Sequence, residues 1–318
     1  MIEERPAKRS LSPYAALFGV QVFFGSLPVI GKVVLAVIPS AALVGFRVGI
    51  TAIVLFIFQR TRGNLRLARR DDYRRLGVLS LFGVTFNQLL FVGGLSLTKA
   101  SNTSLLAVTI PIFTLAVGSA IGGEKLHVRK IIGILVAAVG VLFLIDPRSA
   151  SFSSQTTIGD LMIILNSLSY GIYVATSKEV VTRNGALRSI TWIFIFASLI
   201  CVPVGLISLR SVDVPEVDAV IWLLIGYIGV FATAAPYLLN AWALARVNPS
   251  TVAVFVYLQP LIGFIMAVIF LGERTDLKFG IAALLVFCGV YLTTRSRTIK
   301  GSAIGNNEVS ETKPTPSA

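Results

Sequence analysis

The stretch KASNTSLLAVTIPIFTLAVGSAIGGEK, residues 99–125, decides the fold because its pattern returns at residues 248–274 as NPSTVAVFVYLQPLIGFIMAVIFLGER. Pro111 and Pro260 are 149 positions apart (260 − 111), and so are Glu124 and Glu273 (273 − 124). Each copy is an apolar run of the length, about 20 residues, that crosses the hydrocarbon core of a bilayer as a helix. The chain therefore carries the same membrane-crossing unit twice.

The composition supports a membrane protein. Of the 318 residues, 55% are hydrophobic and 14% are charged, and the mean hydropathy is +0.83. This apolar share exceeds that of an ordinary soluble domain. The net charge of +13 is explained by basic segments between spans, so we expect no nucleic-acid partner. Two cysteines inside apolar runs and a single histidine exclude a disulfide framework and a Cys/His metal cluster, and we expect no cofactor.

Apolar runs bounded by charged residues, Gly, Pro and Ser predict an all-α polytopic membrane protein with ten transmembrane helices. Runs of this length favour helices over barrel strands, because the backbone in lipid must satisfy its own hydrogen bonds. The predicted spans are residues 12–37, 41–59, 74–97, 100–122, 128–145, 158–178, 187–208, 218–244, 249–271 and 277–294.

The positions of lysine and arginine predict the orientation. With the N-terminus in the cytoplasm, 21 of the 28 basic residues fall in cytoplasmic segments. Cytoplasmic segments of membrane proteins are enriched in Lys and Arg. We therefore expect a multi-pass protein of the cell (inner) membrane with both termini in the cytoplasm. Residues 1–11 then form a retained cytoplasmic tail, and the polar residues 296–318 a disordered one.

Five spans per copy is an odd number, so the second copy must cross the membrane in the opposite direction. The sequence therefore predicts two inverted five-helix repeats, residues 12–146 and 157–295. The offset of 149 also aligns Gly77 with Gly226 and Gly140 with Gly289.

Three further features carry a resemblance: Gly-Glu twelve residues after each paired proline, FGS at residues 24–26, and Phe46-Arg47. With the two five-helix halves, they make residues 11–295 resemble the EamA-type branch of the drug/metabolite transporter superfamily. The resemblance implies a transporter that works by alternating access, with a central cavity lined mainly by helices 1, 3, 4, 6, 8 and 9. Many members have Trp where this chain has Phe24. Members export amino acids and other metabolites, so the family name does not define the substrate.

Polar residues at helical spacing form stripes on the first, sixth and eighth spans, which predicts a polar cavity between the halves. The alternative is that these groups only hold helices together by hydrogen bonds. Positions near the paired prolines add candidates in the fourth and ninth spans. The substrate-binding candidates are Gln21, Lys32, Arg47, Asn102, Asn166, Tyr170, Tyr173, Tyr237, Asn240, Tyr257 and Gln259.

Lys32 and Arg47 are the two cations that this topology does not place in a loop. Either could bind a carboxylate or phosphate of the substrate. The alternatives are that the side chain extends to the lipid headgroups or pairs with a backbone carbonyl. Lys32 is the stronger candidate because it lies on the polar stripe of the first span.

The remaining candidates concern movement and stability. Proline inside a span kinks the helix, so Pro28, Pro111, Pro236 and Pro260 are expected hinges. Glu124 and Glu273 precede the fifth and tenth spans, and we expect each to satisfy the free N–H groups of the helix that follows it. No carboxylate lies at mid-span, which favours a facilitator, an exchanger, or a carrier whose substrate takes the proton.

These observations predict a secondary transporter that exports a small polar metabolite, preferably an amino acid or related carboxylate. An exporter of aromatic compounds or drugs and a non-transporting scaffold remain as alternatives. An enzyme is not expected, because no intramembrane cluster of His, Asp, Cys or Glu has catalytic spacing. The expected partners are the small-molecule substrate and the lipid bilayer. A monomer suffices for transport, since one chain holds both halves, and the sequence does not exclude a dimer.

Overall fold

A computed structural model describes residues 12–98, 103, 106–145, 156–211, 217–262, 265 and 277–294. In these residues the secondary structure is helical, without strands. The first half contains α1 (Pro13–Leu35), α2 (Ser40–Arg62), α3 (Arg70–Ser80), α4 (Phe86–Leu97), α6 (Thr109–Ala120) and α7 (Val128–Ile145). The second half contains α8 (Thr157–Asn184), α9 (Ala186–Ser208), α10 (Ala219–Gly229), α11 (Ala235–Leu244), α12 (Pro249–Val254) and α14 (Leu277–Thr294).

These helices confirm the predicted polytopic all-α architecture. Among the described residues, five helices or continuous helical segments are long and apolar enough to cross a membrane. Shorter apolar helices lie at four of the other expected spans. The third span is α3 and α4 together, and the eighth is α10 and α11 together. Each pair is joined by a π-helical turn, Leu81–Thr85 in the first half and Val230–Ala234 in the second. The two turns are 149 positions apart (230 − 81), so the repeat extends to a local irregularity of the backbone.

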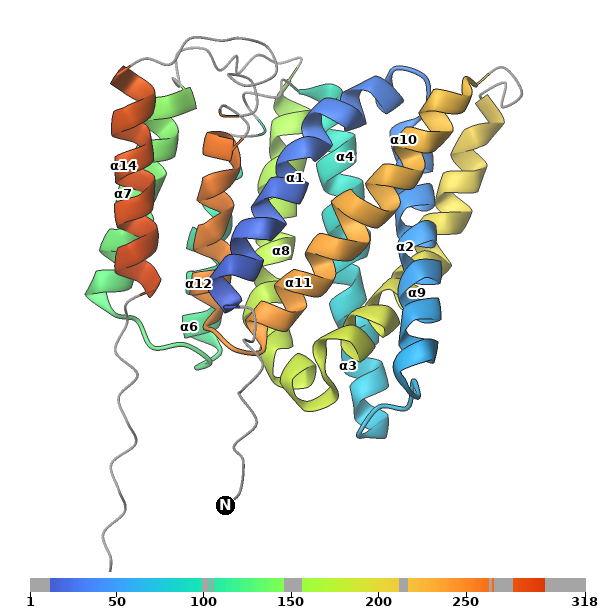
Figure 1. The fold of residues 1–318 in the computed structure, drawn as a ribbon, viewed down its shortest axis with the longest axis horizontal. Coiled ribbons are helices and arrows are strands. Elements are labelled where there is room, and N and C mark those ends of the chain that lie inside the picture. Colours follow the sequence, from blue (N-terminus) through green and yellow to red (C-terminus); the bar gives the residue numbers. More distant parts are fainter. Residues whose placement is uncertain are drawn as a thin grey trace, which may run out of the picture.

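The two halves pack against each other through equivalent helices. In Figure 1, α7 lies beside α14 at one side of the bundle and α2 beside α9 at the other, while α1 crosses α11. Close approach of α7 and α14 requires glycine: a Cβ atom on Gly289 would lie 2.4 Å from the carbonyl oxygen of Gly133. Small residues allow this contact between membrane helices, where burial of apolar surface gives no driving force.

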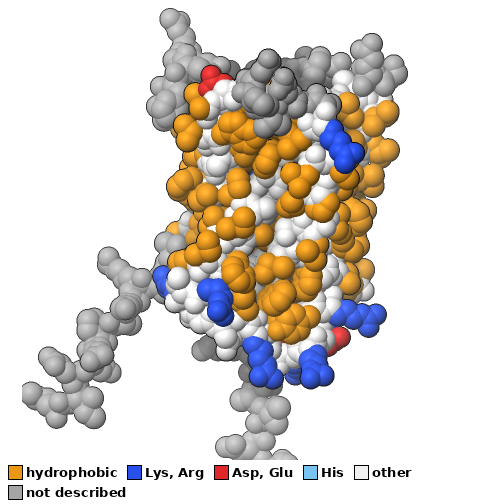
Figure 2. All heavy atoms as spheres, turned by 90° about the vertical axis from the view of Figure 1, so that its right-hand side faces the viewer, with side chains coloured by type: hydrophobic (Ala, Val, Ile, Leu, Met, Phe, Trp, Pro, Cys, Tyr) orange, Lys and Arg blue, Asp and Glu red, His pale blue; other side chains and the backbone are white. Residues whose placement is uncertain are grey.

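The outer surface is that of a membrane-embedded protein. Figure 2 shows a broad hydrophobic face, with most of the Lys and Arg side chains gathered at one end. Large apolar side chains point outward along the helices, including Leu199 at 68% exposure and Leu223 at 73%. A continuous apolar belt of this kind would be costly in water and is suited to lipid. The chain is therefore a multi-pass membrane protein.

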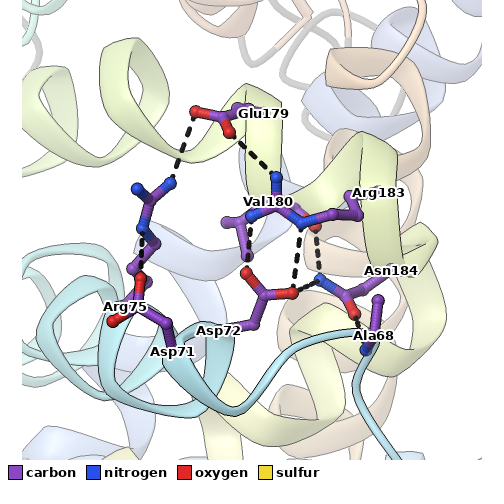
Figure 3. A network of polar contacts seen from close by, with 8 residues as sticks. All are labelled: Ala68, Asp71, Asp72, Arg75, Glu179, Val180, Arg183 and Asn184. Carbon is purple, nitrogen blue, oxygen red and sulfur yellow. Dashed lines mark hydrogen bonds and ion pairs between the residues drawn. The ribbon is translucent and has the colours of Figure 1, made fainter.

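A polar network joins the halves at the basic end of the bundle (Figure 3). The Arg183 guanidinium donates to both carboxylate oxygens of Asp72, at 2.5 and 3.1 Å. The Asn184 side chain donates to Asp72 at 2.9 Å and accepts from the N–H of Ala68 at 2.8 Å. Asp72 is fully buried. These bonds tie the start of α3 to the end of α8, and the exposed pair Arg75–Glu179 continues the network at 3.4 Å.

Several expectations fall outside the described residues. The tails, residues 1–11 and 296–318, are among them, as are Asn102 and Glu273. Pro28 and Lys32 lie within α1, but the structure describes only their backbone.

Candidate functional site

A cavity with a volume of about 100 Å³ lies between the two halves. The polar part of its lining consists of amides, tyrosine hydroxyls and one guanidinium, and its apolar part includes two phenylalanines. The lining residues are Gln21, Phe24, Leu27, Arg47, Asn87, Gln88, Phe91, Ala107, Ile110, Ile163, Asn166, Tyr170, Tyr237, Asn240, Val252, Val256 and Gln259.

The cavity lies at the pseudo-twofold axis that relates the two inverted halves. The Gln88 side chain donates to the Tyr237 hydroxyl at 2.6 Å, and these residues are 149 positions apart. The Tyr257 hydroxyl donates to the carbonyl of Val108 at 2.8 Å, again across 149 positions. Repeat-equivalent residues can touch only where a pseudo-twofold axis passes between them. The cavity is therefore formed by both halves together.

Tyr237 is the centre of the polar lining. Besides accepting from Gln88, its hydroxyl lies 3.1 Å from two acceptors, the carbonyl of Gly83 and the side-chain oxygen of Asn87. Gly83 belongs to the π-helical turn of the first half. Two rings pack against the Tyr237 ring in T-shaped contacts, with the Phe24 centroid at 5.9 Å and the Phe194 centroid at 5.0 Å. These contacts hold the hydroxyl in place in the cavity wall.

The other amides are held in pairs that cross between elements. Gln259 donates to Gln21 at 2.8 Å, which joins the ninth span to α1. Asn240 on α11 donates to the Tyr170 hydroxyl on α8 at 2.7 Å. Asn166 donates to the carbonyl of Asn87 at 2.8 Å. Because amides have both donors and acceptors, each pair retains hydrogen-bonding capacity for a ligand.

Arg47 introduces a positive charge into this wall. It is 1% exposed, and its Nε donates to the Thr233 hydroxyl at 3.1 Å. Its Nη1 atom is buried without a hydrogen-bond partner among the described residues. The guanidinium stays protonated at neutral pH. A buried polar atom without a partner is costly, so this group is suited to bind an anion that enters the cavity.

The EamA-like transporter family model matches residues 11–146 and again residues 157–295. The chain belongs to this family. An uncharacterized transporter of Archaeoglobus fulgidus is 28% identical over 228 residues, covering 70% of this chain and 77% of that protein. The uncharacterized transporter YyaM of Bacillus subtilis is 24% identical over 288 residues, covering 89% and 93%. One solved crystal structure superposes with a TM-score of 0.74 at 17% identity, covering 89% of this chain and 96% of the other, which shows a shared fold.

The cavity of this EamA-like transporter brings together seven of the candidates predicted from sequence, and it adds two. Asn87 and Gln88 are adjacent amides inside an apolar span, a signal that the three polar stripes did not include. Tyr173 and Tyr257 are buried and do not belong to the lining. The Tyr173 ring fills the space beside Gly83, where a Cβ atom would lie 2.5 Å from it. The candidates in the lining are Gln21, Arg47, Asn166, Tyr170, Tyr237, Asn240 and Gln259.

Three of the predicted hinge prolines lie at breaks in regular α-helix. Pro236 is the second residue after the π-helical turn of the eighth span, and Pro260 is the third residue after the 3-10 turn Phe255–Tyr257. Pro111 is in the first turn of α6, after the turn at residues 107–108. A missing backbone N–H weakens the helix at each position, which is compatible with bending there.

Glu124 bonds differently from the expectation. Its carboxylate accepts from the ammonium of Lys130 at 2.5 Å and from the backbone N–H of Ser250 at 3.1 Å, and the Ser250 hydroxyl also bonds to it. The helix start that it satisfies is therefore that of α12 in the other half, rather than α7. Local sequence order suggested α7, but the packing of α6 against α12 brings Ser250 within reach. Beside this group, Lys178 donates to the carbonyl of Val247 at 2.8 Å.

Proposed function

We propose that this EamA-like transporter exports a small metabolite that carries a carboxylate, an amino acid or a related compound, across the inner membrane. The observation that carries the proposal is the polar cavity shared by the two inverted halves. Its amides and hydroxyls come from both halves, so a ligand there would contact both at once. The basic end of the bundle, with both termini, faces the cytoplasm in this proposal. The chain acts as a carrier and not as an enzyme.

The proposed cycle is alternating access, in which the halves rock about the cavity. At the basic end, Glu124 follows α6 and bonds to Ser250 on α12, so these contacts hold the two helices together. Opening the cavity toward the cytoplasm requires them to separate. Lys130 belongs to the same half as Glu124 and moves with it, so the buried carboxylate keeps its counter-ion when Ser250 leaves.

A second candidate is export of aromatic compounds. Phe24, Phe91, Tyr170 and Tyr237 all line the cavity and offer ring faces and edges to an aromatic substrate. Buried Arg47 disfavours the cationic members of that class, because like charges repel strongly where solvent is excluded. An aromatic carboxylate would be a substrate under either candidate function.

Flux from liposomes tests the proposal. Vesicles containing the purified protein are loaded with labelled amino acids, hydroxy and oxo carboxylates, and aromatic amines, and efflux is followed for each. In Ala107→Phe a ring occupies the cavity, so efflux should be about tenfold slower. Leu199→Phe adds bulk on the lipid-facing surface instead and should export at the normal rate. Export of none of these compounds by the unmodified protein would contradict the proposal.

A further inference from the structure

The charge of the cavity limits what can enter it. The structure describes six carboxylates, and each already has a partner at a helix end or in an ion pair. None of the six lines the cavity. Arg47 is thus an uncompensated cation within the described wall. The six are Asp71, Asp72, Glu124, Asp160, Glu179 and Asp218.

The backbone holds Arg47 in this position. Its partner Thr233 belongs to the π-helical turn Val230–Ala234 and donates its own proton to the carbonyl of Ile228 at 2.7 Å. The oxygen of Thr233 is therefore oriented to accept from Arg47. One turn further along α2, the Thr51 hydroxyl donates to the carbonyl of Gly229 at 2.7 Å. Two bonds thus fasten α2 to the irregular turn and to the residue that precedes it, and π-helical turns occur frequently at functional sites.

We infer that the substrate binds as a net monoanion, with its carboxylate on the free side of the Arg47 guanidinium. This inference rests on the proposed function and narrows its substrate class. Counting only the described wall, a bound monoanion brings the net charge to zero, whereas a zwitterionic amino acid leaves one positive charge and an amine leaves two. In a buried site these differences are weakly screened, so they separate ligands of equal shape. The transported compound is a carboxylate without an ammonium group.

The rest of the lining defines the body of that anion. Phe24 and Phe91 contribute rings, and Leu27 and Ile163 contribute aliphatic surface. Asn87 and Gln88 can bond to a hydroxyl or carbonyl oxygen. A hydroxy or oxo monocarboxylate with an apolar or aromatic side chain matches all three features.

Three compounds that share a phenylethyl group test the inference. Phenyllactate is a monoanion, phenylalanine a zwitterion, and phenethylamine, which lacks the carboxyl group, a cation. Binding to the purified full-length protein is measured by the change in tryptophan fluorescence and by thermal shift. We expect phenyllactate to bind at least about tenfold more tightly than phenylalanine, and phenethylamine to bind least. Equal binding of the first two, a preference for either of the others, or binding of none would overturn the inference.

Variants assign the preference to Arg47. Arg47→Gln should remove the preference for the anion, and Arg47→Lys should keep part of it, since an ammonium retains the charge without the planar fork. Arg62→Gln is the matched control: Arg62 lies on the same helix, is exposed and contacts the Phe58 ring, so the preference should persist. An unchanged preference in both Arg47 variants would overturn the inference.

Comparison with liposome flux separates this inference from the proposed function. If phenyllactate binds through Arg47 but no compound crosses the membrane, transport is contradicted and the site stands. If amino acids are exported in preference to hydroxy and oxo carboxylates, the proposed transport function stands, and the inference that the substrate is a net monoanion is overturned.

Discussion

Arg47 and Lys130 are both cations buried inside the bundle, at 1% and 3% exposure, yet their surroundings differ. Lys130 has a carboxylate at 2.5 Å, and Glu124 is in turn satisfied by Ser250. Arg47 has one bond to a neutral hydroxyl and a guanidinium nitrogen left over. A paired buried charge is committed to the protein's own structure. An unpaired one in a cavity wall remains available to a ligand. Whether a buried cation has a carboxylate partner therefore decides whether it serves the fold or a ligand.

Breaking the paired cation should have the largest effect. Glu124→Ala leaves the Lys130 ammonium buried without a counter-ion, so the free energy of unfolding should fall by about 3–5 kcal/mol. Unfolding by denaturant in detergent measures it. The double variant Glu124→Gln, Lys130→Met should recover much of the loss, because neither member of this buried ion pair then carries a charge. Glu179→Gln, which removes an exposed partner of Arg183, should cost far less, because solvent screens this ion pair. Equal costs for the two Glu variants would contradict the comparison.

Removing the unpaired cation should abolish ligand binding and leave stability nearly unchanged. Arg47→Met deletes a charge that no described carboxylate compensates, so the free energy of unfolding should change by less than about 1 kcal/mol or rise. The same denaturant titration measures stability, and fluorescence measures loss of phenyllactate binding. A loss of stability as large as that of Glu124→Ala would show that Arg47 serves the fold rather than a ligand.

The contact between the halves should contribute only modestly to stability. Ser250→Ala removes a hydroxyl bond to Glu124 but leaves its bond to Lys130, so the cost should be about 1 kcal/mol. The cytoplasmic end should open more often. In a background without Cys201 and Cys288, an impermeant thiol reagent on the cytoplasmic side should label Val252→Cys faster. Ser119→Ala is the control, because this half-buried serine on α6 bonds only to the carbonyl of Ala116 in its own helix among the bonds described. Unchanged labelling would count against Ser250 as part of a gate.

Much of the fold was predictable, because span length and the repeat are local properties of the chain. The offset measured between prolines also relates the two π-helical turns to each other, but nothing in the residues 81–85 and 230–234 predicted either turn. For the site, helical spacing correctly grouped Tyr237 with Asn240 and Asn166 with Tyr170, since each pair shares a helix face. It could not separate Tyr173, which packs against Gly83, because depth in a bundle depends on the neighbouring helix.

By itself, the repeat of residues 99–125 at 248–274 determined that the chain has two halves, and the odd number of spans determined that they are inverted. Tertiary structure alone decided which charges are paired. Glu124 meets Ser250 across 126 positions, and Arg47 meets Thr233 across 186. Such partners depend on how helices cross, and no spacing within one helix encodes that crossing. The paired proline segments therefore define the architecture, and the packing around Arg47 defines the candidate site.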